Sequence, residues 1–186
     1  GAAGAMGAGV RAFDVRPEVA EQVESMGASF VKVDMESEVS SDGYAKEMTA
    51  EQEAATAAMY DEEARNADIV ITTALIPGRP APKLISAESV AGMANGSVIV
   101  DMAAANGGNC ELTKTDQKVV TDNLVTVLGY TDLAGRLAAQ TSQLYGTNIV
   151  NLLKLMTPEK DGALTLDLED VIVRGITVTK GGESMW

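Results

Sequence analysis

The sequence contains no histidine, a single cysteine and only 4% aromatic residues among its 186 positions. Without histidine, nucleophilic catalysis by a histidine-dependent triad is excluded. Cys110, the one cysteine, cannot form a disulfide within the chain and fits a reducing compartment. The carboxylates show no metal-ligand spacing, so we predict no metal site.

Basic residues are also scarce, with 14 Lys and Arg against 27 Asp and Glu, for a formal net charge of −13. This charge opposes attraction to a phosphate backbone, so we predict no nucleic-acid binding. No run approaches the roughly 20 apolar residues needed to cross a bilayer. We therefore expect no direct membrane insertion of this chain.

Hydrophobic residues make up 46% of the sequence, and Gly is plentiful at 18. Five short apolar runs, bounded by turn residues, predict buried strands. They are residues 9–13, 29–33, 68–72, 97–100 and 124–128. Helix-like stretches alternate with them, one from Arg16 to Gly27 and another from about Ala50. The alternation predicts an α/β fold, namely a Rossmann-like, doubly wound parallel sheet with helices on both faces.

The two ends of the chain depart from this alternation. Residues 140–155 predict an amphipathic helix of about four turns, and residues 171–179 predict a terminal strand. We therefore expect a nucleotide-binding domain over residues 1–140 and a connecting helix with a terminal strand over 141–186. The acidic segment 36–49 is predicted to be a long surface loop, either functional or a solvated linker.

Asp14 follows the first predicted strand at its carboxyl end. A carboxylate there can accept hydrogen bonds from both ribose hydroxyls of an adenosine, which favours NAD and repels the 2′-phosphate of NADP. The alternative is an N-cap for the helix beginning at Pro17, and the two roles can coexist.

Gly1 and Gly4 belong to a glycine-rich start that would let backbone amides approach a pyrophosphate. Only ten positions separate Gly4 from Asp14, whereas a dinucleotide fold needs about 20 residues and a whole helix there. Either the first strand and part of the first helix are missing, so that the fold is incomplete at the N-terminus, or these glycines are not the phosphate loop. We favour missing residues.

Three further segments follow predicted strands at the edge where open α/β sheets bind ligands. They are residues 72–78, 101–108 and 129–133, all rich in small side chains that leave room for a flat ring. Each alone is a strand end followed by a turn, but together they predict a nicotinamide cleft. Hydride transfer requires no strong acid or base from the protein, so the lack of histidine does not exclude it.

Several motifs together carry a resemblance to a known family. They are RAFDVR at 11–16, GYAKEM at 43–48, TTALIPGRPAP at 72–82, NGGNC at 106–110 and LYGTN at 144–148. They resemble the NAD(H)-binding domain, in the alpha subunit, of proton-translocating NAD(P) transhydrogenase, a relative of alanine dehydrogenase. The segments 72–82 and 43–48 are the most specific, because generic Rossmann proteins lack them.

The resemblance, combined with the pattern of strand ends, implies a set of NAD(H)-binding residues. Asp14, Val15 and Arg16 would line the adenosine ribose, and Gly43 and Tyr44 would belong to a mobile loop that closes over the nucleotide. The full set is Gly1, Gly4, Asp14, Val15, Arg16, Gly43, Tyr44, Thr73, Ala74, Leu75 and Gly129. No catalytic residue is named, because in the family the catalytic side chains lie in an N-terminal lobe that this sequence lacks.

The resemblance also implies an activity and partners. The domain would hold NADH for direct hydride transfer to NADP(H) on a separate NADP-binding domain, while a transmembrane domain couples the reaction to proton translocation. We expect a homodimer on the cytoplasmic face of a bacterial inner membrane or on the matrix side of the mitochondrial one. The chain would be a fragment with two unnatural ends, and we expect it to be inactive when alone.

Two other functions remain open. Alanine dehydrogenase shares the layout but has an acidic side chain just before the Gly-Gly pair, where this sequence has Ala105 and Asn106. The second is a nucleotide-binding module without chemistry, such as a redox sensor or an assembly subunit. Alanine-dependent reduction of NAD would identify the first, and absence of turnover with an NADP-binding partner the second.

Overall fold

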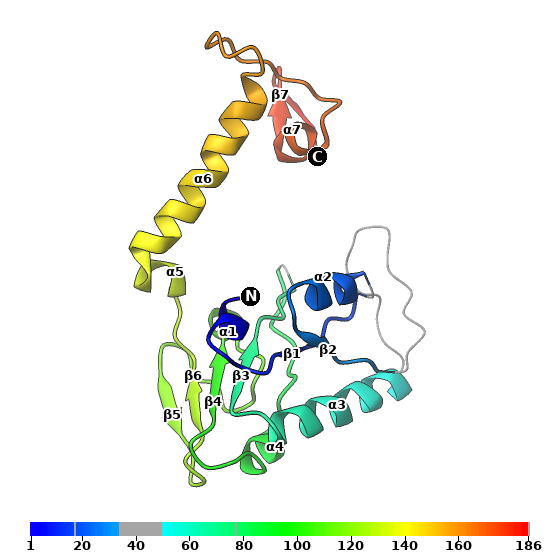
Figure 1. The fold of residues 1–186 in the computed structure, drawn as a ribbon, viewed down its shortest axis with the longest axis vertical. Helices are drawn as coiled ribbons and strands as arrows, with labels where there is room; N and C mark the ends of the chain where they lie inside the picture. Colours follow the sequence, from blue (N-terminus) through cyan, green and yellow to red (C-terminus); the bar gives the residue numbers. More distant parts are fainter. Residues whose placement is uncertain (17, 34–49, 77, 186) are drawn as a thin grey trace. The chain divides into compact units, whose positions relative to one another are not determined.

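The computed structural model describes residues 1–16, 18–33, 50–76 and 78–185. The predicted loop residues Gly43 and Tyr44 lie outside these described ranges. The chain forms two compact units, Gly1–Thr131 and Asp132–Trp186, and each is described by itself. Figure 1 shows the helices and strands, coloured along the chain from blue at the N-terminus to red at the C-terminus.

The first unit begins with a short α1 (Ala2–Ala5) and a two-stranded parallel sheet. β1 (Arg11–Ala12) pairs with β2 (Ser29–Phe30), and α2 (Val19–Ser25) connects them. This is the predicted strand–helix–strand crossover, on a smaller scale. The chain leaves α2 through Gly27, whose φ of 82° suits glycine at a helix C-terminus.

A four-stranded sheet forms the centre of the unit, in the order β3-β4-β6-β5. The strands are β3 (Ile69–Thr72), β4 (Val98–Asp101), β5 (Lys118–Val120) and β6 (Thr126–Leu128). β3, β4 and β6 run parallel, whereas β5 is antiparallel to β6. The fully parallel sheet is therefore corrected to a mixed sheet. β5 was missed because three residues show little periodicity, and a tight turn at Leu124 (φ 60°) folds it back on β6.

The core lies where this sheet packs under the helices α3 (Ala50–Arg65) and α4 (Ala87–Ala91). Its buried members are Ala64, Ile85, Val90, Met93, Ile99, Cys110, Val125 and Val127. Alternate strand residues supply it, as a pleated sheet requires. On the other face of β3, Ile69 and Ile71 are 63% and 60% exposed. The predicted helix beginning near Ala50 is confirmed.

The second unit is mainly helical. It contains α5 (Leu133–Arg136), α6 (Ala138–Met156), α7 (Val171–Ile176) and the antiparallel pair β7 (Thr179–Lys180) and β8 (Glu183–Ser184). α6 confirms the predicted amphipathic helix. Within the described residues, none of the helices combines the length and the apolar character that a membrane span needs.

The predicted strand over residues 171–179 is wrong for most of its length. α7 forms there because the Asp170 carboxylate accepts hydrogen bonds from the backbone N–H groups of Ile172 (2.8 Å) and Val173 (3.0 Å). This N-cap starts a helix in spite of its β-branched residues. Val173, inside this helix, is buried. Strand pairing begins only at Thr179.

Candidate nucleotide site

Several of the predicted site residues in the first unit follow the carboxyl ends of its strands. Asp14 comes two residues after β1, and Thr73–Leu75 follow β3 directly. The segment after β4 and Gly129 after β6 lie at the same edge, because β3, β4 and β6 are parallel neighbours. This is the edge at which open α/β sheets bind ligands.

The Asp14 carboxylate is held by Arg16. Its Oδ1 accepts hydrogen bonds from the backbone N–H and the Nε of Arg16, both at 2.9 Å, and its Oδ2 accepts one from Nη2, also at 2.9 Å. The side-chain hydrogen bond from Arg16 lowers the pKa of Asp14, although burial partly opposes it. The side chain is 27% exposed. Asp14 is therefore charged and reachable at neutral pH.

Asp14 does not cap α2. The N-cap of that helix is Glu18, which makes no side-chain capping bond, and the backbone amide that Asp14 accepts is that of Arg16. The capping alternative is thus not realised in the structure. The guanidinium of Arg16 is exposed, so the carboxylate can exchange its two side-chain hydrogen bonds for ribose hydroxyls at little cost, because exposed ion pairs contribute little stability.

Aromatic rings lie beside this carboxylate. Phe13 stacks on Phe30 with ring centroids 6.4 Å apart and meets Tyr60 of α3 edge to face at 5.5 Å. Burial, together with the negative charge of Asp14, raises the pKa of Tyr60 to about 12. Tyr60 is therefore neutral, and the rings attach the small β1–β2 sheet to α3.

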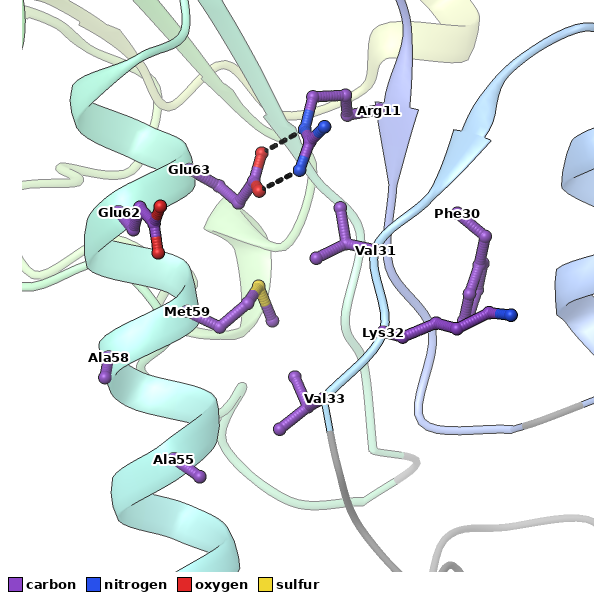
Figure 2. A pocket seen from close by; sticks show the side chains of 10 residues that line it. All are labelled: Arg11, Phe30, Val31, Lys32, Val33, Ala55, Ala58, Met59, Glu62 and Glu63. Atoms are coloured by element: carbon purple, nitrogen blue, oxygen red, sulfur yellow. Dashed lines mark hydrogen bonds and ion pairs between the residues drawn. The ribbon is translucent and has the colours of Figure 1, made fainter.

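An ion pair makes a second attachment between these elements. Arg11 of β1 donates its Nε to Glu63 of α3 at 2.6 Å and pairs its Nη2 with the other carboxylate oxygen. The pair lines a hollow of about 550 Å³ between β2 and α3. Figure 2 shows the side chains that line it. Val31 and Met59 point into the hollow.

This hollow is not the predicted site. None of its lining residues belongs to the predicted NAD(H)-binding set, and its one arginine is already neutralised by Glu63. Its walls are otherwise mostly small or apolar, with Lys32 and Glu62 as further charges. We therefore attribute it to the spacing of the strand and helix.

The segment after β3 combines buried and exposed positions. The Thr72 hydroxyl, at the end of β3, is buried and is the one buried side-chain polar atom in the described part of the chain without a hydrogen-bond partner. An orphaned buried hydroxyl is rare and points to a missing polar partner. Thr73 is exposed and Leu75 is 50% exposed, whereas the backbone of Ala74 is bonded to Asn109.

Asp101, the first residue of the predicted loop after β4, faces inward. Its carboxylate is fully buried and accepts hydrogen bonds from the backbone N–H of Ala103 (3.0 Å), the backbone N–H of Cys110 (2.9 Å) and the hydroxyl of Thr113 (2.6 Å). Gly108 packs against it, since an added Cβ would lie 2.6 Å from Asp101 Oδ2. Asp101 therefore organises the loop and does not line the open side.

Gly129 is required by a close approach. A Cβ there would lie 2.3 Å from the carbonyl oxygen of Lys114, and the Gly129 N–H donates to Gln117 at 2.9 Å. This packing explains the glycine without a ligand. Its contact with a cofactor stays a prediction.

Gly1 and Gly4 lie at α1, the four-residue helix that precedes β1. The chain leaves α1 through Gly7, with a φ of 88°, and then enters β1. A helix that enters this strand matches the later part of a strand–helix–strand unit better than its phosphate-binding beginning. The contact of Gly1 and Gly4 with the nucleotide stays a prediction.

The residues present fit a nucleotide. Asp14 offers two acceptor oxygens to ribose hydroxyls, and Thr72 an unpaired hydroxyl at the same class of strand end. Among the described residues, no three Cys, Asp or Glu side chains come together in a way that would hold a metal ion. The fold and these strand ends define a Rossmann-like domain of the dinucleotide-binding type.

The chain belongs to the family described as alanine dehydrogenase/PNT, C-terminal domain, whose model matches residues 1–186. It is 58% identical over 186 residues to NAD(P) transhydrogenase subunit alpha of Haemophilus influenzae, covering 100% of this chain and 36% of that protein. It is 53% identical over 185 residues to NAD(P) transhydrogenase subunit alpha of Cereibacter sphaeroides, covering 98% and 35%. The resemblance inferred from the motifs is confirmed.

Solved structures agree. The crystal structure of transhydrogenase from Sinorhizobium meliloti superposes with a TM-score of 0.67 at 40% identity, covering 98% of this chain and 47% of that one. L-alanine dehydrogenase gives a TM-score of 0.61 at 22% identity, covering 86% and 40%, and shows the shared fold. The chain thus spans about a third to a half of the proteins that it matches.

Proposed function

We propose that this chain is the NAD(H)-binding part of an NAD(P) transhydrogenase alpha subunit. In the whole protein it holds NADH for direct hydride transfer to NADP(H) on a partner domain, and a membrane domain couples that transfer to proton translocation. The transhydrogenase relatives support the proposal. Because the chain spans only part of those relatives, the activity is assigned to the whole protein, Re/Si-specific as in the family, and not to the fragment.

One observation carries the proposal in the structure. A charged, reachable aspartate stands at the carboxyl end of β1, and both its oxygens accept hydrogen bonds from the exposed Arg16. Two acceptor oxygens match the two donors of an adenosine ribose, and the negative charge repels a 2′-phosphate. Asp14 therefore selects NAD(H) over NADP(H).

The other residues of the set bind and orient the nucleotide. Val15 and Arg16 line the ribose, and Thr73, Ala74 and Leu75 lie along the cofactor after β3. The rest of the set consists of Gly1, Gly4, Gly129, Gly43 and Tyr44, of which the last two lie outside the described residues. NAD(H) supplies the hydride when bound, and the protein residues hold the nucleotide and exclude water from it.

The remaining chemistry lies with partners. No residue of this chain is assigned a catalytic role, and the NADP-binding and transmembrane domains complete the enzyme. We propose that the protein is a homodimer located at the cytoplasmic face of a bacterial inner membrane or at the matrix side of the mitochondrial inner membrane.

Calorimetric titration of the full-length protein with NADH and then NADPH tests the proposal. We expect a clear preference for NADH, and we expect Asp14→Ala to weaken NADH binding by about 1.5–3 kcal/mol through loss of charged hydrogen bonds. Asp61→Ala is the matched control, because Asp61 also pairs with an arginine, Arg65 at 2.7 Å, but on α3. Equal binding of both nucleotides would contradict the proposal.

The alanine dehydrogenase alternative is tested in the same preparation. The segment before Gly107 carries Ala105 and Asn106, both exposed and neither acidic, so the carboxylate that would act on an amino or keto substrate is lacking. We expect no alanine-dependent reduction of NAD, measured by absorbance of NADH. Hydride transfer to NADP in the presence of the partner domain would separate an enzyme from a binding module.

A further inference from the structure

We propose that Asn109 is a positioning residue of the nucleotide site, whose side-chain amide fixes the backbone of the segment after β3 in its binding conformation. The inference rests on the proposed function, because it concerns residues Thr73–Leu75 of the proposed site. It adds a residue that lies 35 positions away in the sequence from the backbone that it holds.

The Asn109 amide is fully buried and uses every hydrogen-bonding group that it has toward that end. Its Oδ1 accepts from the backbone N–H of Ala74 at 3.1 Å, and its Nδ2 donates to the carbonyl oxygens of Ala74 (2.9 Å) and Pro82 (2.8 Å). One acceptor and two donors fix both the position and the orientation of the amide plane. Ala74 is held at both its backbone groups by one side chain.

This arrangement determines what the segment can offer to a ligand. The N–H and C=O of Ala74 are already paired, so its backbone polar groups are not the ones that meet a nucleotide. Thr73 and Leu75, which flank it, have exposed side chains, 50% exposed for Leu75. We call this set of Asn109 hydrogen bonds the clamp. It pairs the backbone of Ala74 and leaves the side chains of Thr73 and Leu75 exposed at the edge where ligands bind.

Asn109 is itself held in place. Its carbonyl oxygen accepts hydrogen bonds from the backbone N–H of Leu84 (2.7 Å) and of Ile85 (3.1 Å), and the next residue, Cys110, donates its N–H to the buried Asp101 carboxylate. A clamp built on a fixed backbone transmits that position to what it binds. The position of the segment after β3 therefore depends on the position of Asn109 in the segment after β4.

A second set of hydrogen bonds connects the same two segments, with the donor now in the segment after β3. Lys83, from the segment after β3, donates its ammonium to the carbonyl oxygens of Gly107 (2.6 Å) and Gly108 (2.9 Å) in the segment after β4. The two segments thus hold each other, one through a buried amide and one through an ammonium group. The Asn109 amide is buried whereas Lys83 is exposed, so the hydrogen bonds of Asn109 constrain the segment after β3 more strongly.

The test compares two asparagines with the same chemistry in the full-length protein. Asn123 also donates its Nδ2 to backbone carbonyls, those of Val90 (3.0 Å) and Ala91 (3.2 Å), but it precedes β6 and lies at the opposite, amino end of the strands. Asn109→Ala and Asn123→Ala therefore both lose a carbonyl clamp, and only the first loses the proposed positioning. Circular dichroism identifies the temperature range in which both variants are folded, and all binding is measured there.

In that range we expect Asn109→Ala to raise the Kd for NADH at least about tenfold, and Asn123→Ala to leave it within about twofold. Amide hydrogen exchange without nucleotide gives an independent reading, since the Ala74 N–H should exchange faster in Asn109→Ala only. Unchanged NADH affinity in a folded Asn109→Ala protein, or an equal loss in Asn123→Ala, would overturn the inference alone. No NADH binding by the unaltered protein would overturn the proposed function and the inference with it.

Discussion

Asp14 and Asp101 occupy equivalent places in the fold and have opposite surroundings. Each stands at or just beyond the carboxyl end of a parallel strand, β1 or β4. Asp101 is fully buried, and three donors from the chain fill its oxygens. Asp14 is partly exposed and, among the described residues, accepts hydrogen bonds from Arg16.

The difference shows that a strand-end aspartate is not by itself a ligand site. A carboxylate whose oxygens are filled by backbone N–H groups stabilises a loop and has nothing left to offer. A carboxylate whose side-chain partner is an exposed guanidinium can change that partner. The segment after β4 is therefore supported by buried hydrogen bonds, and the end of β1 is the place where we propose that a ligand is bound.

The largest effect that this comparison predicts is on stability. Asp101→Ala should lower the free energy of unfolding by about 3–4 kcal/mol, because two backbone N–H groups would be left buried without acceptors. Urea unfolding followed by circular dichroism measures it. Thr113→Val removes only one donor to the same carboxylate and should cost about 1 kcal/mol. A loss below about 1 kcal/mol for Asp101→Ala would contradict its role as the organiser of the loop.

Two glycines with similar backbone angles sharpen the contrast. Gly108 has a φ of 79° and would place a Cβ 2.6 Å from Asp101 Oδ2, whereas Gly7, near β1, has a φ of 88° with open space around it. Gly108→Ala should cost about 2–3 kcal/mol, from strain and overpacking together. Gly7→Ala should cost about 1 kcal/mol, from strain alone. Thermal unfolding of both variants measures the difference, and equal losses would show that the packing around Asp101 is loose.

For the exposed aspartate, Asp14, the expected effect is a change in the pKa of its carboxyl group. The side-chain hydrogen bond from Arg16 is the main reason for the low pKa of Asp14, so Arg16→Ala should raise that pKa toward its ordinary value. A depressed carboxylate pKa stabilises the folded state above the unfolded pKa, and this contribution is lost as the pH falls through the folded pKa. In Arg16→Ala, the contribution of Asp14 to the loss of folding stability at acid pH should therefore be smaller. NMR titration of the carboxyl carbon measures it, and an unchanged pKa would contradict the pairing.

The smallest effect concerns the single thiol beside Asp101. Burial raises the pKa of Cys110, which disfavours the reactive thiolate. We expect slow reaction with a thiol reagent at about pH 8 in the folded protein and fast reaction after unfolding. Asp101→Ala should accelerate labelling, because Cys110 loses the acceptor of its backbone N–H. Rapid labelling of the unaltered protein would indicate that this region is open.

Local signals in the sequence account for much of the fold. The strand–helix alternation located β1 to β4 and β6, and the amphipathic period located α6. β5 was missed because Lys118–Val120 is too short to carry a period, and its pairing depends on a turn that brings it back to β6. The helix at α7 was predicted as a strand because its β-branched residues outweighed the capping Asp170.

The candidate site was predictable only in part. Asp14 could be recognised because its place after a strand and its charge are local features. Asn109 and the inward turn of Asp101 carried no local signal, since their partners lie 35 and up to 12 residues away. A buried polar network is defined by contacts between separate loops, which spacing along the chain does not record.

The sequence by itself determined the class of fold, the family and the position of the ribose-binding candidate, because each depends on residue types in short segments. The tertiary structure alone decided which strand-end side chains face inward and which remain free. The physical reason is that burial and hydrogen-bond satisfaction are properties of the packed molecule. Asp14 and Asp101 are the same residue type, and the donors gathered around them leave Asp14 partly exposed and make Asp101 a buried support of its loop.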